Sequence, residues 1–242
     1  MRTRIRHGLA AALAVSALSL TAACGGGDAK DGAKKDTDKP AATTSAAPTS
    51  EAPATPLTAA QMKAAVLEVK DLPAGWKSGS ADTDQIQPKA DKTECQPLAG
   101  LMADTIAGAT MGPSGSFERT SDTTGLDSQV FTFPATGATD FVKALGTSLD
   151  TCKGFAADLQ GMKMTVTAEK LNGPKAGEES HAFRLKMKIA DLAMNVESNM
   201  LVVRQGTGVV RISHVPPNAS GHKDFDALAK LATDKFVKGA QS

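Results

Sequence analysis

Three cysteines, Cys24, Cys95 and Cys152, carry the most reactive side chains of this 242-residue chain. A thiol can close a disulfide, bind a metal ion or act as a nucleophile. No two of the three have the close spacing of a metal-binding cysteine pair. In an oxidising compartment two cysteines can pair, and the third then needs a separate fate. The residues around each cysteine therefore decide its chemistry.

The residues before Cys24 have the pattern of an export signal. Three arginines among the first six residues precede an apolar run over 8–23, which is shorter than the ~20 residues needed to cross a membrane. Segment 1–23 therefore predicts a signal peptide. Leu20, Thr21 and two alanines lead into Cys24 and resemble the lipobox of bacterial lipoproteins, in which a peptidase cleaves before a cysteine carrying diacylglycerol. The resemblance implies acyl chains such as palmitate on Cys24, which would hold the protein on the extracytoplasmic face of the cell membrane.

An ordinary signal peptidase is the alternative, because Thr21 and Ala23 also suit its cleavage site. That enzyme would release a soluble protein. The cysteine count bears on the choice. With Cys24 acylated, Cys95 and Cys152 remain as an even pair, and we expect them to form one disulfide. Without acylation, an exported protein would carry an odd reactive thiol.

The segment after Cys24 has the composition of a tether. From Gly25 to Pro56 the chain contains no Val, Ile, Leu, Met, Phe or Trp. Such a segment cannot offset the entropy of ordering its backbone, so we predict a disordered linker over 24–56. Its root-mean-square span is roughly 30 Å. The remaining residues, 57–242, are enough for one folded domain.

Patterns typical of catalysis or metal binding are missing from the sequence of this domain. Gly112 to Ser116 does not form a Gly-x-Ser-x-Gly elbow, which disfavours an exported hydrolase. The domain's three histidines, His181, His214 and His222, show no i, i+4 pair, and we interpret His214 as a structural or surface residue. We therefore expect no catalytic residue, no metal, no cofactor and no enzymatic activity. The balance of 27 basic against 26 acidic residues argues against a nucleic-acid partner.

Alternating cations stand out on one expected strand. They are Arg184, Lys186 and Lys188, and we expect Arg211 beside them on a neighbouring strand. A cationic sheet face could bind an anionic envelope ligand or a lipid headgroup; the alternative is an ordinary solvated face. Methionines on the same strands either fill the core or line a deformable lipid cavity; these are Met164, Met187, Met194 and Met200.

Apolar periodicity sets the expected elements. It predicts helices near 58–72, 95–107, 138–152 and 224–238, and strands near 117–121, 128–133, 162–166, 183–189, 192–203 and 209–215. The first helix opens with a capping box at Thr58. The strands alternate apolar and polar residues, as in a half-buried antiparallel sheet. This order predicts an α+β fold with an antiparallel sheet of about five or six strands and helices packed on one face.

Four features occur together in the predicted domain. They are the turn Asp71–Trp76, Cys95 at the head of a helix, the strand Val130–Phe133, and the helix from Ala138 to Cys152. Together they resemble the PknH-like extracellular sensor domains of high-GC Gram-positive bacteria. The resemblance implies an antiparallel sheet with flanking helices around a cleft that binds a ligand or partner, without catalytic residues.

The sequence thus favours a membrane-anchored, extracytoplasmic lipoprotein with a non-catalytic, sensor-like binding domain. Its partner would be an unidentified small molecule, lipid or protein of the cell envelope. The alternative is a lipid carrier whose sheet and helices enclose a hydrophobic cavity lined by Met and Phe.

Overall fold

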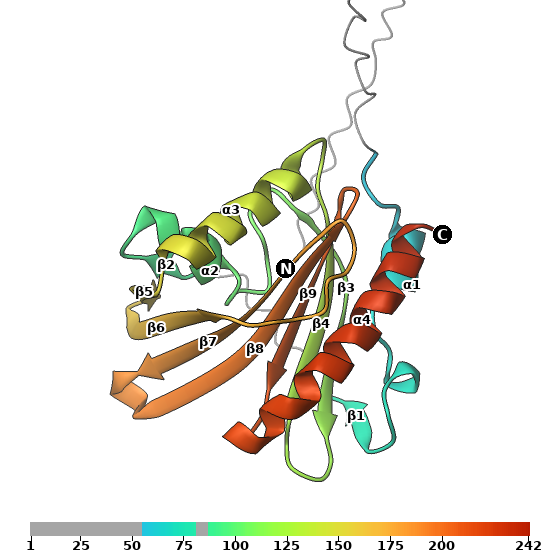
Figure 1. Ribbon diagram of the computed structural model, residues 1–242. Coiled ribbons are helices and arrows are strands. Elements are labelled where there is room, and N and C mark those ends of the chain that lie inside the picture. The colour runs from blue at the N-terminus through green and yellow to red at the C-terminus, as the bar shows by residue number, and fades with distance from the viewer. Residues whose placement is uncertain (1–54, 81–86) are drawn as a thin grey trace, which may run out of the picture. The chain divides into compact units, whose positions relative to one another are not determined.

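The computed structural model describes residues 55–80 and 87–242 (Figure 1). The predicted signal peptide, Cys24 and nearly all of the predicted linker lie outside the described residues. The described residues belong to one compact unit. Both hydrophobic cores and the disulfide lie within it, so this unit contains what a domain needs to fold on its own.

All strands of the described part belong to one antiparallel sheet. They are β1 (Trp76–Ser78), β2 (Lys89–Ala90), β3 (Thr110–Arg119), β4 (Gly125–Thr132), β5 (Gly154–Leu159), β6 (Met162–Lys170), β7 (Glu179–Ile189), β8 (Met194–Gln205) and β9 (Gly208–Val215). Their order across the sheet is β1-β3-β4-β9-β8-β7-β6-β5-β2. The expected five or six strands are therefore too few, because β1, β2 and β5 join the six that periodicity predicts. The very short β1 and β2 close the two edges of the sheet.

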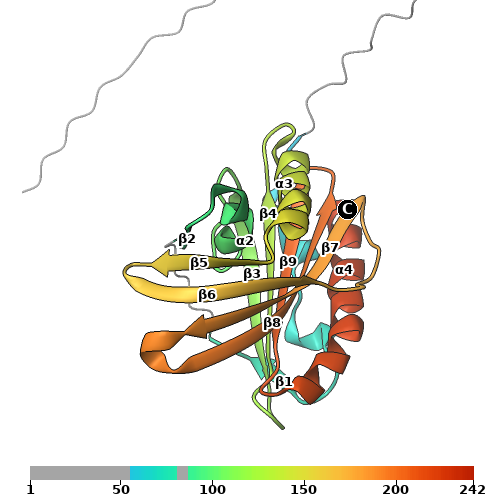
Figure 2. The same ribbon diagram turned by 60° about the vertical axis from the view of Figure 1, so that its left-hand side comes forward.

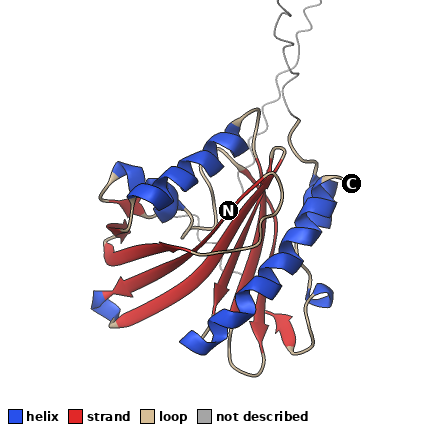
Figure 3. Ribbon diagram, viewed as in Figure 1, coloured by secondary structure: helices blue, strands red, loops and turns tan. Residues whose placement is uncertain are grey.

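Four α-helices accompany the sheet in the described ranges (Figure 3). They are α1 (Ala59–Ala65), α2 (Gln96–Gly100), α3 (Gly137–Thr151) and α4 (Phe225–Ala240). Short 3-10 helices supplement them: η1 (Val69–Asp71), η2 (Thr93–Cys95), η3 (Ala190–Leu192) and η4 (Ala219–Asp224). The predicted capping box is confirmed, since Thr58 Oγ1 accepts from the Gln61 amide and the Gln61 side chain accepts from the Thr58 amide. None of these helices is long and apolar enough to cross a membrane.

Helices cover both faces of the sheet, not one face as expected. Figures 1 and 2 show α3 on one side of the strands and α4 on the other. Alternation along the central strands explains this arrangement. In β8, Val202 packs into the core beneath α3 and Val203 into the core beneath α4. In β9, Val209 and Val210 divide in the same way. These strands are buried on both sides, so each face needs its own helical cover.

The helix predicted over 95–107 is wrong beyond its first turns. The α-helix ends at Gly100, and the chain continues as a loop over 101–104. The carbonyl oxygens of Leu101 and Ala103 accept hydrogen bonds from the buried Arg211 guanidinium of β9. Those acceptors are thus used by a side chain of the sheet. The loop 101–104 is held on the sheet instead of extending the helix.

The predicted disulfide is present. Cys95 at the end of η2 bonds Cys152 just after α3, with their Cα atoms 5.6 Å apart and a sequence separation of 57. Both cysteines are buried in the core beneath α3. The bond therefore fastens the segment before α2 to the helix that covers this face.

The C-terminal helix approaches α1 at a glycine. A Cβ atom added at Gly239 would lie 2.5 Å from backbone atoms of Ala65, closer than packed atoms approach. Gly239→Ala is therefore expected to push α4 away from α1 and to lower the free energy of unfolding by about 1–3 kcal/mol. Urea unfolding checks this, with the exposed Lys238→Ala in the same turn as a control that stays within about 0.5 kcal/mol of the parent. Equal stability of both variants would contradict the tight crossing.

Candidate functional site

A cleft of about 370 Å³ opens on the face of the sheet that α3 covers. Its floor is formed by β3, β4, β9, β8 and β7, which are neighbours in that order. The loop 101–104 supplies a wall through Leu101, Met102 and Asp104. The cleft is thus a product of the sheet order and of the loop that Arg211 holds down.

The floor of the cleft changes from polar to apolar across the strands. Its polar end comes from β3 and β4, with Ser114, Ser116, Asp127 and Gln129. In the middle, Ser198 of β8 and Ser213 of β9 join their hydroxyls at 2.8 Å. At the other end lie Met200 of β8 and Leu185 and Met187 of β7. A ligand lying across these strands would meet hydroxyls and carboxylates at one end and thioethers at the other.

Arg211 organises the wall of the cleft from a buried position, with only 6 % of its surface exposed. Its Nη1 donates to the carbonyls of Leu101, at 2.7 Å, and Ala103. Its Nη2 donates to Gln129 Oε1 and, at 3.3 Å, to Asp104 Oδ1. Gln129 Nε2 in turn donates to Asp104 Oδ1 at 3.0 Å. Burial lowers the pKa of Arg211, and the charges of Asp104 and Asp127 oppose that shift.

Asp127 is the second carboxylate of the cleft, half-buried at its polar end. Burial raises the pKa of Asp127, while a hydrogen bond from Ser116 and the charge of Arg211 lower it. The described lining residues include no His, Cys or Lys that could serve as a base or nucleophile. In the described ranges as a whole, no three His, Cys, Asp or Glu residues stand close enough to hold a metal ion. The arrangement can bind and orient a small molecule by hydrogen bonds and apolar contact.

The structure does not bring the four predicted cations together. Sheet pairing aligns Arg184 of β7 with Asn199 of β8, and Asn199 with His214 of β9. Arg211 is three residues from His214, and because successive strand residues face opposite sides, it faces the other side of the sheet from Arg184. The expectation that Arg211 lies beside the row is therefore wrong. Lys186 and Lys188 stay on the face of Arg184.

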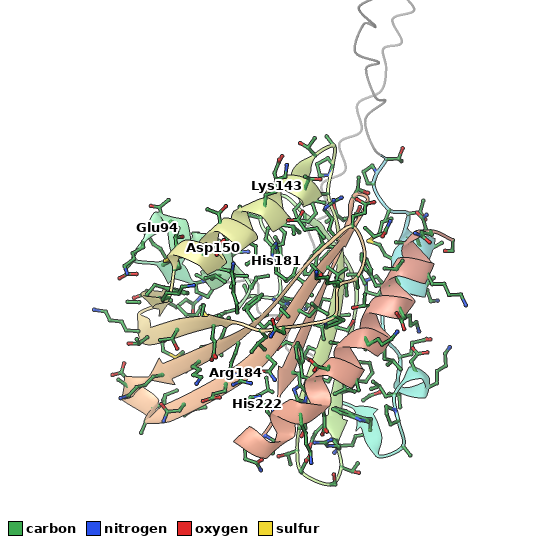
Figure 4. All side chains as sticks on the ribbon, in the orientation of Figure 1. Glu94, Lys143, Asp150, His181, Arg184 and His222 are labelled. Atoms are coloured by element: carbon green, nitrogen blue, oxygen red, sulfur yellow. A yellow bond between two sulfur atoms is a disulfide. The ribbon has the colours of Figure 1, made fainter. Side chains whose placement is uncertain are left out.

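Two of the three remaining cations already have partners. Arg184 Nε donates to Asn199 Oδ1 at 2.8 Å, and Lys186 Nζ lies 3.9 Å from the Glu197 carboxylate. Glu197 also contacts the ring of His222, with Nε2 and Oε2 3.2 Å apart. Figure 4 shows Arg184 and His222 at the lower end of the molecule, away from α3. A role of this row in binding an anion stays a prediction.

His214 is buried completely on the face that α4 covers. Its ring stacks on Phe225 of α4, with ring centroids 6.1 Å apart, and neither ring nitrogen has a hydrogen-bond partner among the described residues. Burial lowers the pKa of His214 to about 4, with smaller contributions in the same direction from His222 and Arg119. Asp224 and Asp122 oppose the shift. The imidazole is therefore neutral in the folded protein at neutral pH.

This neutral histidine makes folding sensitive to acid. Its pKa in the folded state lies below the ordinary value of about 6.5, so the unfolded chain takes up the proton first and stability falls as the pH drops from 6.5 towards 4. Between pH 8 and pH 4.5 the loss from His214 is expected to be about 2–3 kcal/mol. Between these two pH values, the free energy of unfolding of His214→Leu should fall by about 2–3 kcal/mol less than that of the parent, as measured by urea unfolding. Ile212→Val is the control, because it changes an apolar side chain of β9 on the same face and should keep the pH dependence of the parent.

Sequence reasoning missed most residues of the cleft. A signal was available in β4, where Asp127 and Gln129 alternate with Leu126 and Val130. Leu126 and Val130 pack under α1 and α4, so the alternation places both polar residues on the opposite face. The alternation could have indicated a polar patch on this face of β4. It could not have indicated that Asp104, from the distant loop 101–104, lies beside that patch.

No protein-family model and no curated protein matches the chain. Among solved structures, the extracellular domain of PknH from Mycobacterium tuberculosis is similar, with a TM-score of 0.53, 14 % sequence identity, and coverage of 78 % of this chain and 99 % of that one. An uncharacterized protein from Mycobacterium smegmatis is also matched, with a TM-score of 0.40, 9 % identity, and coverage of 77 % and 98 %. Because the two sequences differ widely, the similarity to the PknH extracellular domain concerns the fold alone. The chain therefore has the fold of the PknH extracellular domain.

Proposed function

We propose that this protein is a lipid-anchored, extracytoplasmic binding protein whose domain holds a small ligand in the cleft without transforming it. The observation that carries the proposal is the cleft itself, in which polar groups from β3, β4 and β9 converge beside an apolar floor. Concave sites with a few converging polar groups on an apolar lining are typical of small-molecule binding. The fold likeness to an extracellular domain supports the location.

The anchor is the second part of the proposal. In it, 1–23 is removed as a signal peptide, Cys24 carries the acyl chains, and 24–56 connects the membrane to the domain 57–242. The described chain enters the domain beside the turn between β8 and β9. There Leu57 N donates to Thr132 Oγ1 at 2.7 Å, and Thr207 Oγ1 donates to the Thr55 carbonyl at 3.0 Å. These hydrogen bonds hold the first described residues on the domain, so we expect the linker to leave the domain at this turn.

Binding in the cleft can be tested on protein purified from its own cell envelope. Native mass spectrometry should detect a small molecule that stays bound to the parent protein. Met187→Trp places an indole in the cleft and is expected to abolish the bound mass. Lys186→Trp is the matched control, because it makes the same change one residue earlier, on the opposite face of β7. A parent protein without any bound mass, or an unchanged mass in Met187→Trp, would contradict the proposal.

The anchor is tested separately by growth with labelled fatty acid. The parent protein should take up the label and sediment with membranes, and Cys24→Ala should do neither. Mature protein free in the culture fluid with an unmodified Cys24 would contradict lipidation and favour the soluble alternative.

A lipid carrier remains the second candidate, favoured by the apolar end of the cleft. Of the four methionines singled out in the sequence, Met187 and Met200 line the cleft, Met164 packs in the core, and Met194 is 46 % exposed. The cleft volume of about 370 Å³ is near the lower end for small-molecule sites. The mass and chemistry of the co-purified molecule decide between the two, since a carrier would yield a lipid with long acyl chains.

A further inference from the structure

The orientation of a ligand in the cleft follows from the order of the strands. Ser114 and Ser116 of β3 and Asp127 of β4 lie at one end, and Met187 of β7 lies at the other, with β9 and β8 between them. Met102 of the wall adds a further thioether. The cleft thus matches a molecule with one polar group and one apolar group, a few strand spacings of about 4.8 Å apart.

Arg211 is the one cation among the described lining residues, and its Nη hydrogens are already used. Arg211 directs both hydrogens of Nη1 to backbone carbonyls and both hydrogens of Nη2 to Gln129 and Asp104. A guanidinium has five N–H donors, so only the Nε hydrogen is left outside these contacts. An anion that took up the Nη hydrogens would break bonds that hold the loop 101–104 in place.

The charges of the cleft point to a cationic ligand group. Asp104 and Asp127 are acidic and Arg211 is the single base among the described lining residues. The Asp104 carboxylate is joined to Arg211 and Gln129. The Asp127 carboxylate lies at the polar end among hydroxyls that can accept from an ammonium group. An ammonium beside this carboxylate would form a charge-assisted hydrogen bond.

We infer that the cleft binds a primary amine with a short apolar chain, the ammonium group on Asp127 and the chain over Met200, which pairs with the same residue of β9 as Asp127 does. The inference rests on the proposed binding function of the same cleft and names its ligand class. It also reverses the charge that the sequence suggests for the ligand. The cation-rich row of β7, on the opposite face, plays no part in this site.

Three probes with the same eight-carbon chain test the inference: octylammonium, octanoate and octyl glucoside. They are titrated against the unlipidated chain 25–242, and amide shifts of β4 and β9 report occupancy of the cleft. Octylammonium is expected to bind at least ten-fold more tightly than either other probe. Asp127→Asn, whose amide oxygen can still accept from Ser116, should weaken octylammonium at least ten-fold and leave octyl glucoside unchanged. Asp127→Glu, which restores the charge, should recover most of the affinity.

Asp226→Asn is the matched control, because it removes one exposed negative charge from α4 on the other face and should leave all three affinities unchanged. Octanoate binding as tightly as octylammonium, or an unchanged octylammonium affinity in Asp127→Asn, would overturn the inference. If Met187→Trp still abolished the envelope-derived mass, cleft binding would stand and only the ligand class would be wrong. Absence of both probe binding and that mass would remove both proposals.

Discussion

Arg211→Met is expected to lower the free energy of unfolding by about 3–5 kcal/mol, the cost of removing one partner from a buried charged network. The substitution removes donors from two backbone carbonyls, from Gln129 and from Asp104 at once. The remaining acceptors are left in a place that water reaches poorly. Methionine fills much of the volume, so the loss measures lost hydrogen bonds more than an emptied space. Urea unfolding at neutral pH measures this decrease in the free energy of unfolding.

The loss of stability in Arg211→Met should be accompanied by a local change in the loop 101–104, which hydrogen exchange can measure. Hydrogen exchange in the loop 101–104 is expected to accelerate in Arg211→Met, because the guanidinium is what holds that loop on β9. Arg184→Met is the control, since it removes a half-buried arginine with one side-chain hydrogen bond to Asn199. Its cost should stay near 1 kcal/mol. Similar costs for the two arginines would show that Arg211 does not organise the wall.

Removing the disulfide is the second change with a large expected effect. For a bond that closes 57 residues of sequence separation, the loop-entropy relation gives about 4 kcal/mol. In a domain of this size that corresponds to a decrease in Tm of roughly 10 °C. Cys95→Ala/Cys152→Ala should show this decrease in thermal unfolding followed by circular dichroism.

Reduction provides an independent check on the same bond. Adding a thiol reductant to the parent protein should lower its Tm to that of the double variant and should leave the double variant unchanged. A parent protein whose Tm did not respond to reductant, with both thiols reactive after denaturation, would contradict the pairing of Cys95 and Cys152.

Elements with long periodic patterns could be predicted from the sequence. The helices near 138–152 and 224–238 correspond to α3 and α4, and the alternation over 183–189 lies within β7. The edge strands β1 and β2 span three and two residues, too short for any period to be detected. The sequence did contain a signal that both faces of the sheet are buried. Apolar residues run without interruption from Met200 to Val203 in β8, which is typical of strands covered on both sides.

The site was less accessible to sequence reasoning than the fold. Arg211 alternates with apolar residues just as an exposed arginine of an amphipathic strand would. Its burial depends on the loop 101–104, which lies more than 100 residues earlier in the chain. No local pattern indicates that two carbonyls of that loop need a donor. The register between β7 and β9 was also unknown, and it decides that Arg211 faces away from Arg184.

The edges of the sheet have a consequence for encounters between copies of the protein. An open strand at the side of a sheet is a template on which another chain can add its own strand. Here the outermost strands are only three and two residues long, and the part of β3 beyond β1 contains Pro113 and a bulge between Met111 and Ser114. Proline lacks an amide donor and a bulge interrupts the ladder. Copies of the domain that collide would find only short or interrupted edges in the described part of the sheet, which disfavours strand addition between them.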